Sequence, residues 1–117
     1  IYSSQDIERW HINEMKSLLS RFSGVKFIFD DVKQKYYPVL RDAITSFRSK
    51  NEGKPLVVID DTPFIDFDIL DYPVNDIEEI FLLKGSDAAI WGPKASNGII
   101  VIITQRGKST NIEQKEE

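Results

Sequence analysis

The sequence contains no cysteine and only one histidine, His11. The lack of cysteine excludes a disulfide framework, a thiolate zinc site and a thiol nucleophile, and it leaves the redox compartment open. A Ser-His-Asp triad would depend on His11 alone, which follows Trp10 in a helical context. We therefore expect no catalytic residue and no cofactor.

Long apolar runs are also missing. The longest, Gly98–Ile103, is far shorter than the roughly 20 residues that a membrane-spanning helix needs. With 117 residues, 41% of them hydrophobic, the chain suits one domain with its own core. We place this domain at residues 1–108 and expect Ser109–Glu117 to be a disordered polar tail, because it has too little apolar surface to become ordered. The chain starts at Ile1 without a signal-peptide pattern, so we expect a fragment excised from a longer protein.

Basic residues are scarce in the second half of the chain. The net charge of −4 argues against a nucleic-acid partner, because nucleic-acid-binding domains are normally basic. Residues 1–54 carry a net charge of +3, whereas residues 55–117 carry −7. One stretch has no Lys or Arg at all, and its acidic residues are Asp60, Asp61, Asp66, Asp68, Asp71, Asp76, Glu78 and Glu79.

This acidic stretch allows three interpretations. The plainest is a solvated loop followed by a helix start, where carboxylates are common. The others are a surface for a basic partner and a cation site. A calcium loop is disfavoured, because Asp66-x-Asp68-x-x-Asp71 lacks both the glycine and the terminal glutamate of the EF-hand pattern. We therefore expect no metal.

Apolar periodicity predicts two short helices in the first part of the chain. Ser4 is a candidate N-cap for a helix over Gln5–Trp10, and Asn13 for a second helix over Glu14–Phe22. A strand is predicted over Val25–Phe29, which is rich in β-forming residues.

The next segment, Tyr36–Phe47, is ambiguous, because its periodicity favours a helix while its start also fits an edge strand with a proline.

Three further strands are predicted over Pro55–Ile59, Ile77–Leu83 and Ile99–Ile103, with a single helical turn over Asp87–Trp91 between the last two. Residues 99–103 are almost entirely apolar, so this strand is expected at the centre of its sheet. Together these elements predict an α/β (α+β) fold with a small mixed sheet of about four strands and short helices.

Four sequence blocks, in this order, resemble the plug domain of TonB-dependent outer-membrane receptors, especially the SusC/RagA-like branch of Bacteroidetes. In that family P-L-x-V-x-D-G is followed by N-D-I-E-S-I-E-V-L-K, a turn ending in Y-G, and A-N-G leading to a strand that ends T-K-R-G. The corresponding segments here are Pro55–Asp61, Asn75–Gly85, Asp87–Gly92 and Ala95–Gly107. The family's opening S-x-x-D-I-E is matched by Ser3–Glu8. Leu40–Asp42 is the best local equivalent of the family's strand end I-R-G, so the resemblance favours a strand over the helical interpretation of Val39–Phe47.

The resemblance implies a gate that lies inside a β-barrel of the same parent chain, in the cell outer membrane and facing the periplasm. The TonB complex would pull on a segment not present here, and a SusD-like surface lipoprotein is a further implied partner. The implied function is uptake of nutrients such as glycans. The resemblance also implies that no reaction is catalysed, so we expect a protein that is not an enzyme.

Departures from the family pattern keep alternatives open. Phe81 stands where the family has Glu, and Asp42 and Asp61 stand where it has Gly. They favour a plug-like binding or adaptor module of a barrel-less periplasmic or cell-envelope protein. A separate small-molecule-binding or enzymatic domain is the third hypothesis.

Candidate binding residues come from the acidic stretch, from the turns between Gly85 and Gly98, and from the position equivalent to the family's I-R-G arginine. They would face substrate or barrel wall: Arg41, Asp61, Asp66, Asp68, Lys84, Trp91 and Asn97.

Overall fold

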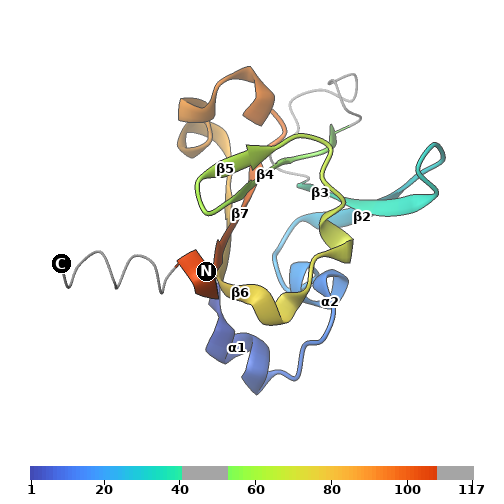
Figure 1. Ribbon diagram of the computed structural model, residues 1–117. Helices are drawn as coiled ribbons and strands as arrows, with labels where there is room; N and C mark the ends of the chain where they lie inside the picture. Colours follow the sequence, from blue (N-terminus) through green and yellow to red (C-terminus); the bar gives the residue numbers. More distant parts are fainter. Residues whose placement is uncertain (41–52, 108–117) are drawn as a thin grey trace.

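A five-stranded mixed sheet forms the centre of the domain in the computed structural model, which describes residues 1–40 and 53–107 (Figure 1). The strand order is β1-β6-β7-β4-β5. A separate antiparallel hairpin, β2–β3, projects from one side. The strands are β1 (Tyr2–Ser3), β2 (Val25–Asp30), β3 (Lys35–Leu40), β4 (Leu56–Ile59), β5 (Thr62–Phe64), β6 (Ile77–Leu83) and β7 (Ile99–Thr104).

Helical structure is short throughout. The α-helices are α1 (Ser4–Arg9) and α2 (Met15–Leu19), and the named 3-10 turns are η3 (Ile69–Asp71), η4 (Val74–Asp76), η5 (Gly85–Asp87), η6 (Ala89–Trp91) and η7 (Pro93–Ala95). No helix among residues 1–40 and 53–107 is long and apolar enough to cross a membrane. The single helical turn expected over Asp87–Trp91 is replaced by η5 and η6, because Gly92, at φ 80°, and Pro93 prevent a longer helix.

Strand β7 lies at the centre of the sheet, as its apolar sequence predicted. It pairs parallel with β4 and antiparallel with β6. Ile99, Ile100 and Ile102 are fully buried, because both faces of this strand are covered along most of its length. The mixed sheet of the sequence prediction is therefore confirmed.

The two faces of the sheet pack against different partners. On the first face, Val57, Ile80, Ile100 and Ile102 join a core closed by Ile7 of α1 and by the α2 residues Met15, Leu18 and Leu19. On the second face, Leu56, Val58 and Ile99 pack against Ala88, Ala95 and Trp91 from the η5–η7 turns. In Figure 1 the helices lie towards the bottom, and these turns lie at the top.

The N-terminal cap is one residue earlier than predicted. Ser3, not Ser4, caps α1: the Ser3 hydroxyl accepts from the Asp6 amide, and the Asp6 carboxylate accepts from the Ser3 amide at 2.9 Å. This reciprocal capping box satisfies two amides at once, which a cap at Ser4 would not do. Helix α2 begins after Glu14 rather than Asn13 and ends at Leu19, so it is shorter than the predicted helix.

The hairpin β2–β3 corrects two predictions. The strand predicted from Val25 exists but does not join the main sheet. Residues 36–40 form a strand, so the helical interpretation is wrong there, while 41–47 lie outside the described residues. Pro38 is tolerated in β3 because, among residues 1–40 and 53–107, this strand pairs on one side only, with Phe27 opposite Pro38.

Sequence periodicity missed two of the strands in the main sheet. Strand β1 pairs with β6 over only two residues, and β5 pairs with β4 over three. Strands this short show no apolar alternation. Residues 77–83 and 56–59 match the predicted strands closely, and the predicted tail, residues 109–117, lies outside the described residues.

Candidate functional site

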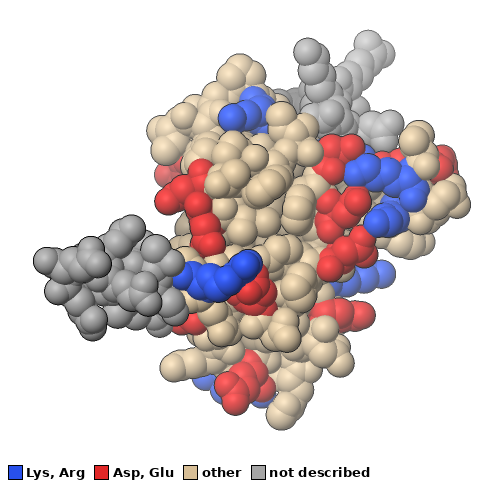
Figure 2. All heavy atoms as spheres, viewed as in Figure 1, with Lys and Arg blue, Asp and Glu red and all other residues tan. Residues whose placement is uncertain are grey.

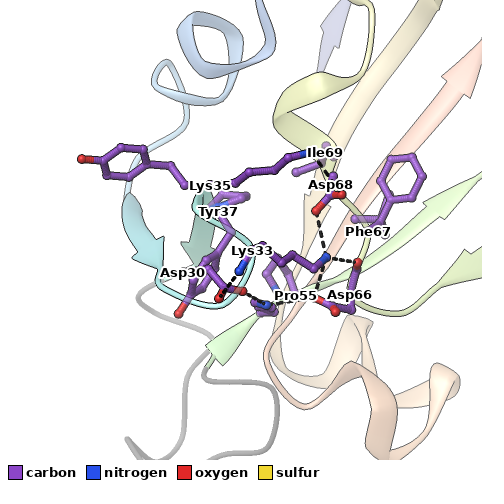
Figure 3. Close-up of a pocket in the computed structure, with 13 residues that line it drawn as sticks. Asp30, Lys33, Lys35, Tyr37, Pro55, Asp66, Phe67, Asp68 and Ile69 are labelled. Atoms are coloured by element: carbon purple, nitrogen blue, oxygen red, sulfur yellow. Dashed lines mark hydrogen bonds and ion pairs between the residues drawn. The ribbon is translucent and has the colours of Figure 1, made fainter.

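Seven charged side chains join the hairpin β2–β3 to the body of the domain. They come from the end and turn of the hairpin, from the residue two positions before β4, from the segment leading into η3, and from η3 itself. Figure 3 draws all of them except Asp71. Figure 2 shows lysine and aspartate side chains intermixed on this side of the domain. We call them the lysine–aspartate cluster: Asp30, Lys33, Lys35, Lys54, Asp66, Asp68 and Asp71.

Two hairpin lysines reach across to the acidic segment. The Lys33 ammonium lies 2.8 Å from the Asp68 carboxylate and 3.1 Å from that of Asp66. The Lys35 ammonium lies 2.6 Å from Asp71 and 3.5 Å from Asp68. The Lys33 hydrogen bond lowers the pKa of Asp68 below its ordinary value. Because Asp66, Asp68 and Asp71 are paired with lysines of the same chain, this part of the acidic stretch is not a free surface for a basic partner.

Lys54 occupies the most enclosed position of the cluster. Its side chain is 15% exposed, and its ammonium lies 2.6 Å from Asp30 and 2.9 Å from Asp66. The same ammonium lies 4.9 Å from the centre of the Tyr37 ring, in cation–π contact. Burial alone would lower the pKa of Lys54, but the hydrogen bonds to Asp30 and Asp66 outweigh it and raise the pKa well above the ordinary lysine value.

Asp30 connects this ion pair to the backbone of the hairpin turn. Its carboxylate accepts from the amides of Val32 at 2.9 Å and Lys33 at 3.2 Å. The Lys54 hydrogen bond, followed by the Lys33 amide, lowers the pKa of Asp30. Fixing the turn therefore also positions Lys33 towards the acidic segment.

The cluster encloses little space. The hollow among these residues, with Tyr37, Pro55, Phe67 and Ile69 on its apolar side, has a volume of about 20 Å³. That is room for a water molecule and not for a nutrient. Among residues 1–40 and 53–107, no three His, Cys, Asp or Glu side chains are grouped so that they could hold a metal ion. The arrangement attaches the hairpin to the body of the domain through charge.

The other predicted binding residues do not form one site with Asp66 and Asp68. Asn97 is buried and donates to the Lys54 carbonyl at 3.2 Å, so it supports the cluster indirectly. Trp91 packs on the second face of the sheet, and Lys84 follows β6 at the same end. Asp61 lies in the β4–β5 turn, at the other end of β4 from Lys54. Arg41 lies outside the described residues.

Sequence reasoning missed the basic half of the cluster. The signal was present in the opposite net charges of the two halves of the chain, +3 and −7, which meet in this cluster. It could have predicted pairing within the chain, but not which lysine meets which aspartate, because the partners are distant in sequence, from 12 residues for Lys54 and Asp66 to 35 for Lys33 and Asp68.

A second group of contacts, around Asp60 and Thr104, explains part of the family motif T-K-R-G, which corresponds to Thr104–Gly107 in this chain. Asp60 accepts from the Thr104 amide at 2.9 Å and from the Thr104 hydroxyl at 2.5 Å. The same hydroxyl accepts from the Gly107 amide at 3.0 Å. A Cβ atom at Gly107 would collide with the Asp60 carboxylate, so this close approach requires glycine. The motif is thus a structural lock between the ends of β4 and β7.

The described residues form a small mixed domain in which the lysine–aspartate cluster joins the hairpin β2–β3 to the rest of the chain. The family model for the TonB-dependent Receptor Plug Domain matches residues 1–99. The chain therefore belongs to this family.

Solved structures share the fold. A mutant of the ferric enterobactin receptor from Pseudomonas aeruginosa, in complex with enterobactin, aligns with a TM-score of 0.65 at 18% identity, over 89% of this chain and 17% of that one. The siderophore receptor PirA from Acinetobacter baumannii aligns with a TM-score of 0.66 at 20% identity, over 89% of this chain and 16% of that one. The present chain therefore spans about a sixth of these receptors, and its plug-like α+β fold is confirmed.

Proposed function

We propose that this chain is the gate of a TonB-dependent outer-membrane transporter. It lies in the lumen of a β-barrel formed by its own parent chain and blocks that lumen until the TonB complex pulls on a segment outside this chain. It carries out no reaction. The observation that carries the proposal is the match of the plug-domain family to residues 1–99.

The lysine–aspartate cluster supports a gating role. A plug has to move or open locally, and segments of low local stability are the ones that do so. Hairpin β2–β3 forms no ladder with the main sheet and is attached partly through ion pairs that contact solvent. Such pairs are weak and are screened by salt. In the proposed gate, the hairpin is the part that separates first from the rest of the plug.

For the transported compound we propose a chemical class and not a particular molecule. The two aligned receptors are named for enterobactin and for a siderophore. The sequence blocks of this chain resemble the SusC/RagA-like branch instead, and on that ground we propose nutrient uptake of the glycan type, with a SusD-like lipoprotein as surface partner. The domain would be located in the outer membrane, facing the periplasm.

Membrane fractionation of the native host with an antibody to this domain tests the proposal. The sample is run on a gel with and without boiling. We expect a large outer-membrane band whose mobility shifts on heating, because a folded barrel resists detergent until it is heated. A soluble or unshifted band would reject the gate and support a barrel-less binding or adaptor module.

A further inference from the structure

The parallel pairing of β4 with β7 ends at Leu56, two residues after Lys54. The Leu56 amide donates to the Gly98 carbonyl at 3.0 Å. In a continued parallel ladder, the Gly98 amide would donate to the Lys54 carbonyl. It donates instead to the Ala95 carbonyl, also at 3.0 Å, within the turn that leads from η7 into β7. The turn therefore leaves the Lys54 carbonyl to a side-chain donor.

Asn97 provides that donor. Its side-chain amide donates to the Lys54 carbonyl at 3.2 Å, and the residue is only 5% exposed. Pro55 restricts the same residue from the other direction, because a residue that precedes a proline is held in extended conformations. Lys54 thus has a bound carbonyl and a restricted backbone, and both fix the direction in which its side chain leaves the chain.

The other end of Lys54 joins the hairpin to the body of the domain. Its ammonium lies 2.6 Å from Asp30, the last residue of β2, and 2.9 Å from Asp66. The Lys54 side chain is 15% exposed, compared with 48% for Lys35, so its ion pairs are less screened by solvent. A change in the direction of the side chain would move the ammonium away from both carboxylates. The attachment of the hairpin therefore depends on how the backbone of Lys54 is held.

We propose that Asn97 is a positioning residue that acts through Lys54. By holding the Lys54 carbonyl, it places the lysine ammonium between its two carboxylate partners and so sets how firmly hairpin β2–β3 is attached. This role requires no barrel, so the inference goes beyond the proposed function.

The same contact connects the two faces of the main sheet. Asn97 lies two residues after η7, whose Ala95 packs on the second face. The hairpin contributes Leu40 to the core on the first face. Figure 1 shows the η5–η7 turns and the hairpin in different parts of the domain. Through Asn97 and Lys54, the conformation of these turns is coupled to the attachment of the hairpin.

Hydrogen exchange followed by mass spectrometry tests the coupling in the full chain. With Asn97→Ala, the amides of β2 and β3 should exchange about fivefold faster, the change expected from the loss of one hydrogen bond, and those of the main sheet should change less. Asn97→Leu has the same branching as asparagine and also lacks a donor, so it replaces the alanine variant if the cavity prevents folding.

The matched control is Gln105→Ala. The Gln105 side-chain amide also donates to a backbone carbonyl at 3.2 Å, that of Asn75, but at the opposite end of β7. Its loss should leave the exchange of β2 and β3 unchanged.

Two further measurements separate positioning from a general structural role. The Lys54 ammonium is held in two ion pairs and should give its own signal in heteronuclear NMR spectra, and Asn97→Ala should broaden or shift that signal. In a Lys54→Met background, Asn97→Ala should add nothing to the exchange of β2 and β3, because the ammonium through which it acts is gone.

The inference is rejected if Asn97→Ala leaves the exchange of β2 and β3 unchanged, accelerates the main sheet equally, or has the same effect in the Lys54→Met background. It is also rejected if both Asn97 variants are unfolded, because Asn97 would then hold the whole domain and not Lys54 in particular. The heat-shift assay tests the gate separately, so either idea can fail without the other.

Discussion

Two neighbouring aspartates in the β4–β5 turn have different roles. Asp60 and Asp61 have φ angles of 47° and 69°, so both lie in the left-handed region that a tight type I′ hairpin turn requires. The Asp60 carboxylate offsets the cost of this backbone conformation by accepting hydrogen bonds from the amide and hydroxyl of Thr104. The Asp61 carboxylate makes no such contact with the described residues, so its conformation is uncompensated within them.

The variant Asp61→Gly should stabilise the isolated chain. Glycine adopts a positive φ without steric cost, and we expect a gain of about 0.5–1 kcal/mol in the free energy of unfolding. Thermal or urea unfolding would measure it. Asp60→Gly is the matched control, because it relaxes the same backbone but removes two hydrogen bonds, and it should destabilise by roughly 1–2 kcal/mol. Equal effects of the two variants would show that the Thr104 contacts are unimportant.

At the scale of the element, β7 contributes buried residues to the core on both faces of the sheet. Replacing Ile100, which is fully buried, with Ala should leave a cavity and cost about 2–4 kcal/mol in unfolding free energy. Val101→Ala on the other face should cost roughly 1 kcal/mol, because Val101 is only half-buried in the isolated domain. Denaturant titration of both variants compares them. A larger loss for Val101→Ala would mean that the two faces of the strand are assigned the wrong way round.

The attachment of hairpin β2–β3 can be tested by exchanging charges. Lys33→Asp places a third carboxylate beside Asp66 and Asp68, so the amides of β2 and β3 should exchange with solvent several-fold faster. Adding Asp68→Lys should restore part of the protection by creating the reversed pair. Hydrogen exchange followed by mass spectrometry reads out both variants.

The salt dependence of exchange is a control for these two variants. Added salt should speed exchange in the hairpin of the unmodified chain and have less effect in the main sheet. If Lys33→Asp leaves the hydrogen exchange of the β2 and β3 amides unchanged, the ion pairs do not attach the hairpin to the rest of the domain.

For the whole molecule, the cluster predicts a stability that depends on pH at both extremes. Asp30, Asp66 and Asp68 have pKa values below their ordinary range in the folded state, chiefly through hydrogen bonds from Lys54 and Lys33. Their contribution is complete above the unfolded pKa of about 4 and is lost as the pH falls through the lower folded values. The pKa values of Lys33 and Lys35 are raised, chiefly by hydrogen bonds to Asp68 and Asp71, so their contribution is lost above about pH 10.4.

The melting temperature should therefore be nearly constant between about pH 5 and pH 9 and fall on either side. Asp66→Asn removes one of the shifted groups, so the difference in melting temperature between variant and unmodified chain should shrink as the pH falls below about 4. Calorimetry across this range measures it. A constant difference at all pH values would mean that the Asp66 charge does not contribute.

Much of the fold could be predicted because the information is local. The apolar run at residues 99–103 predicted a central strand, and residues 56–59 and 77–83 were recognisable from the same kind of pattern. The family resemblance came from turn and strand motifs, and the Gly107 contact with Asp60 gives a physical reason for one of them. Short pieces such as β1 and β5 could not be predicted, because they form only where a neighbouring strand offers a free edge.

Local patterns in the sequence were enough to predict which segments extend, where the main turns fall, and that the chain carries no thiol chemistry. The long-range partners of these segments appear only in the folded chain. In the structure, the carboxylates of Asp66 and Asp68 are paired with Lys33, and Asp61 lies apart from them in the β4–β5 turn. Strand β2 pairs with β3 in a separate sheet and not with the main sheet. The physical reason is distance along the chain: apolar periodicity acts over a few residues, whereas each of these pairings depends on how the whole chain closes on itself.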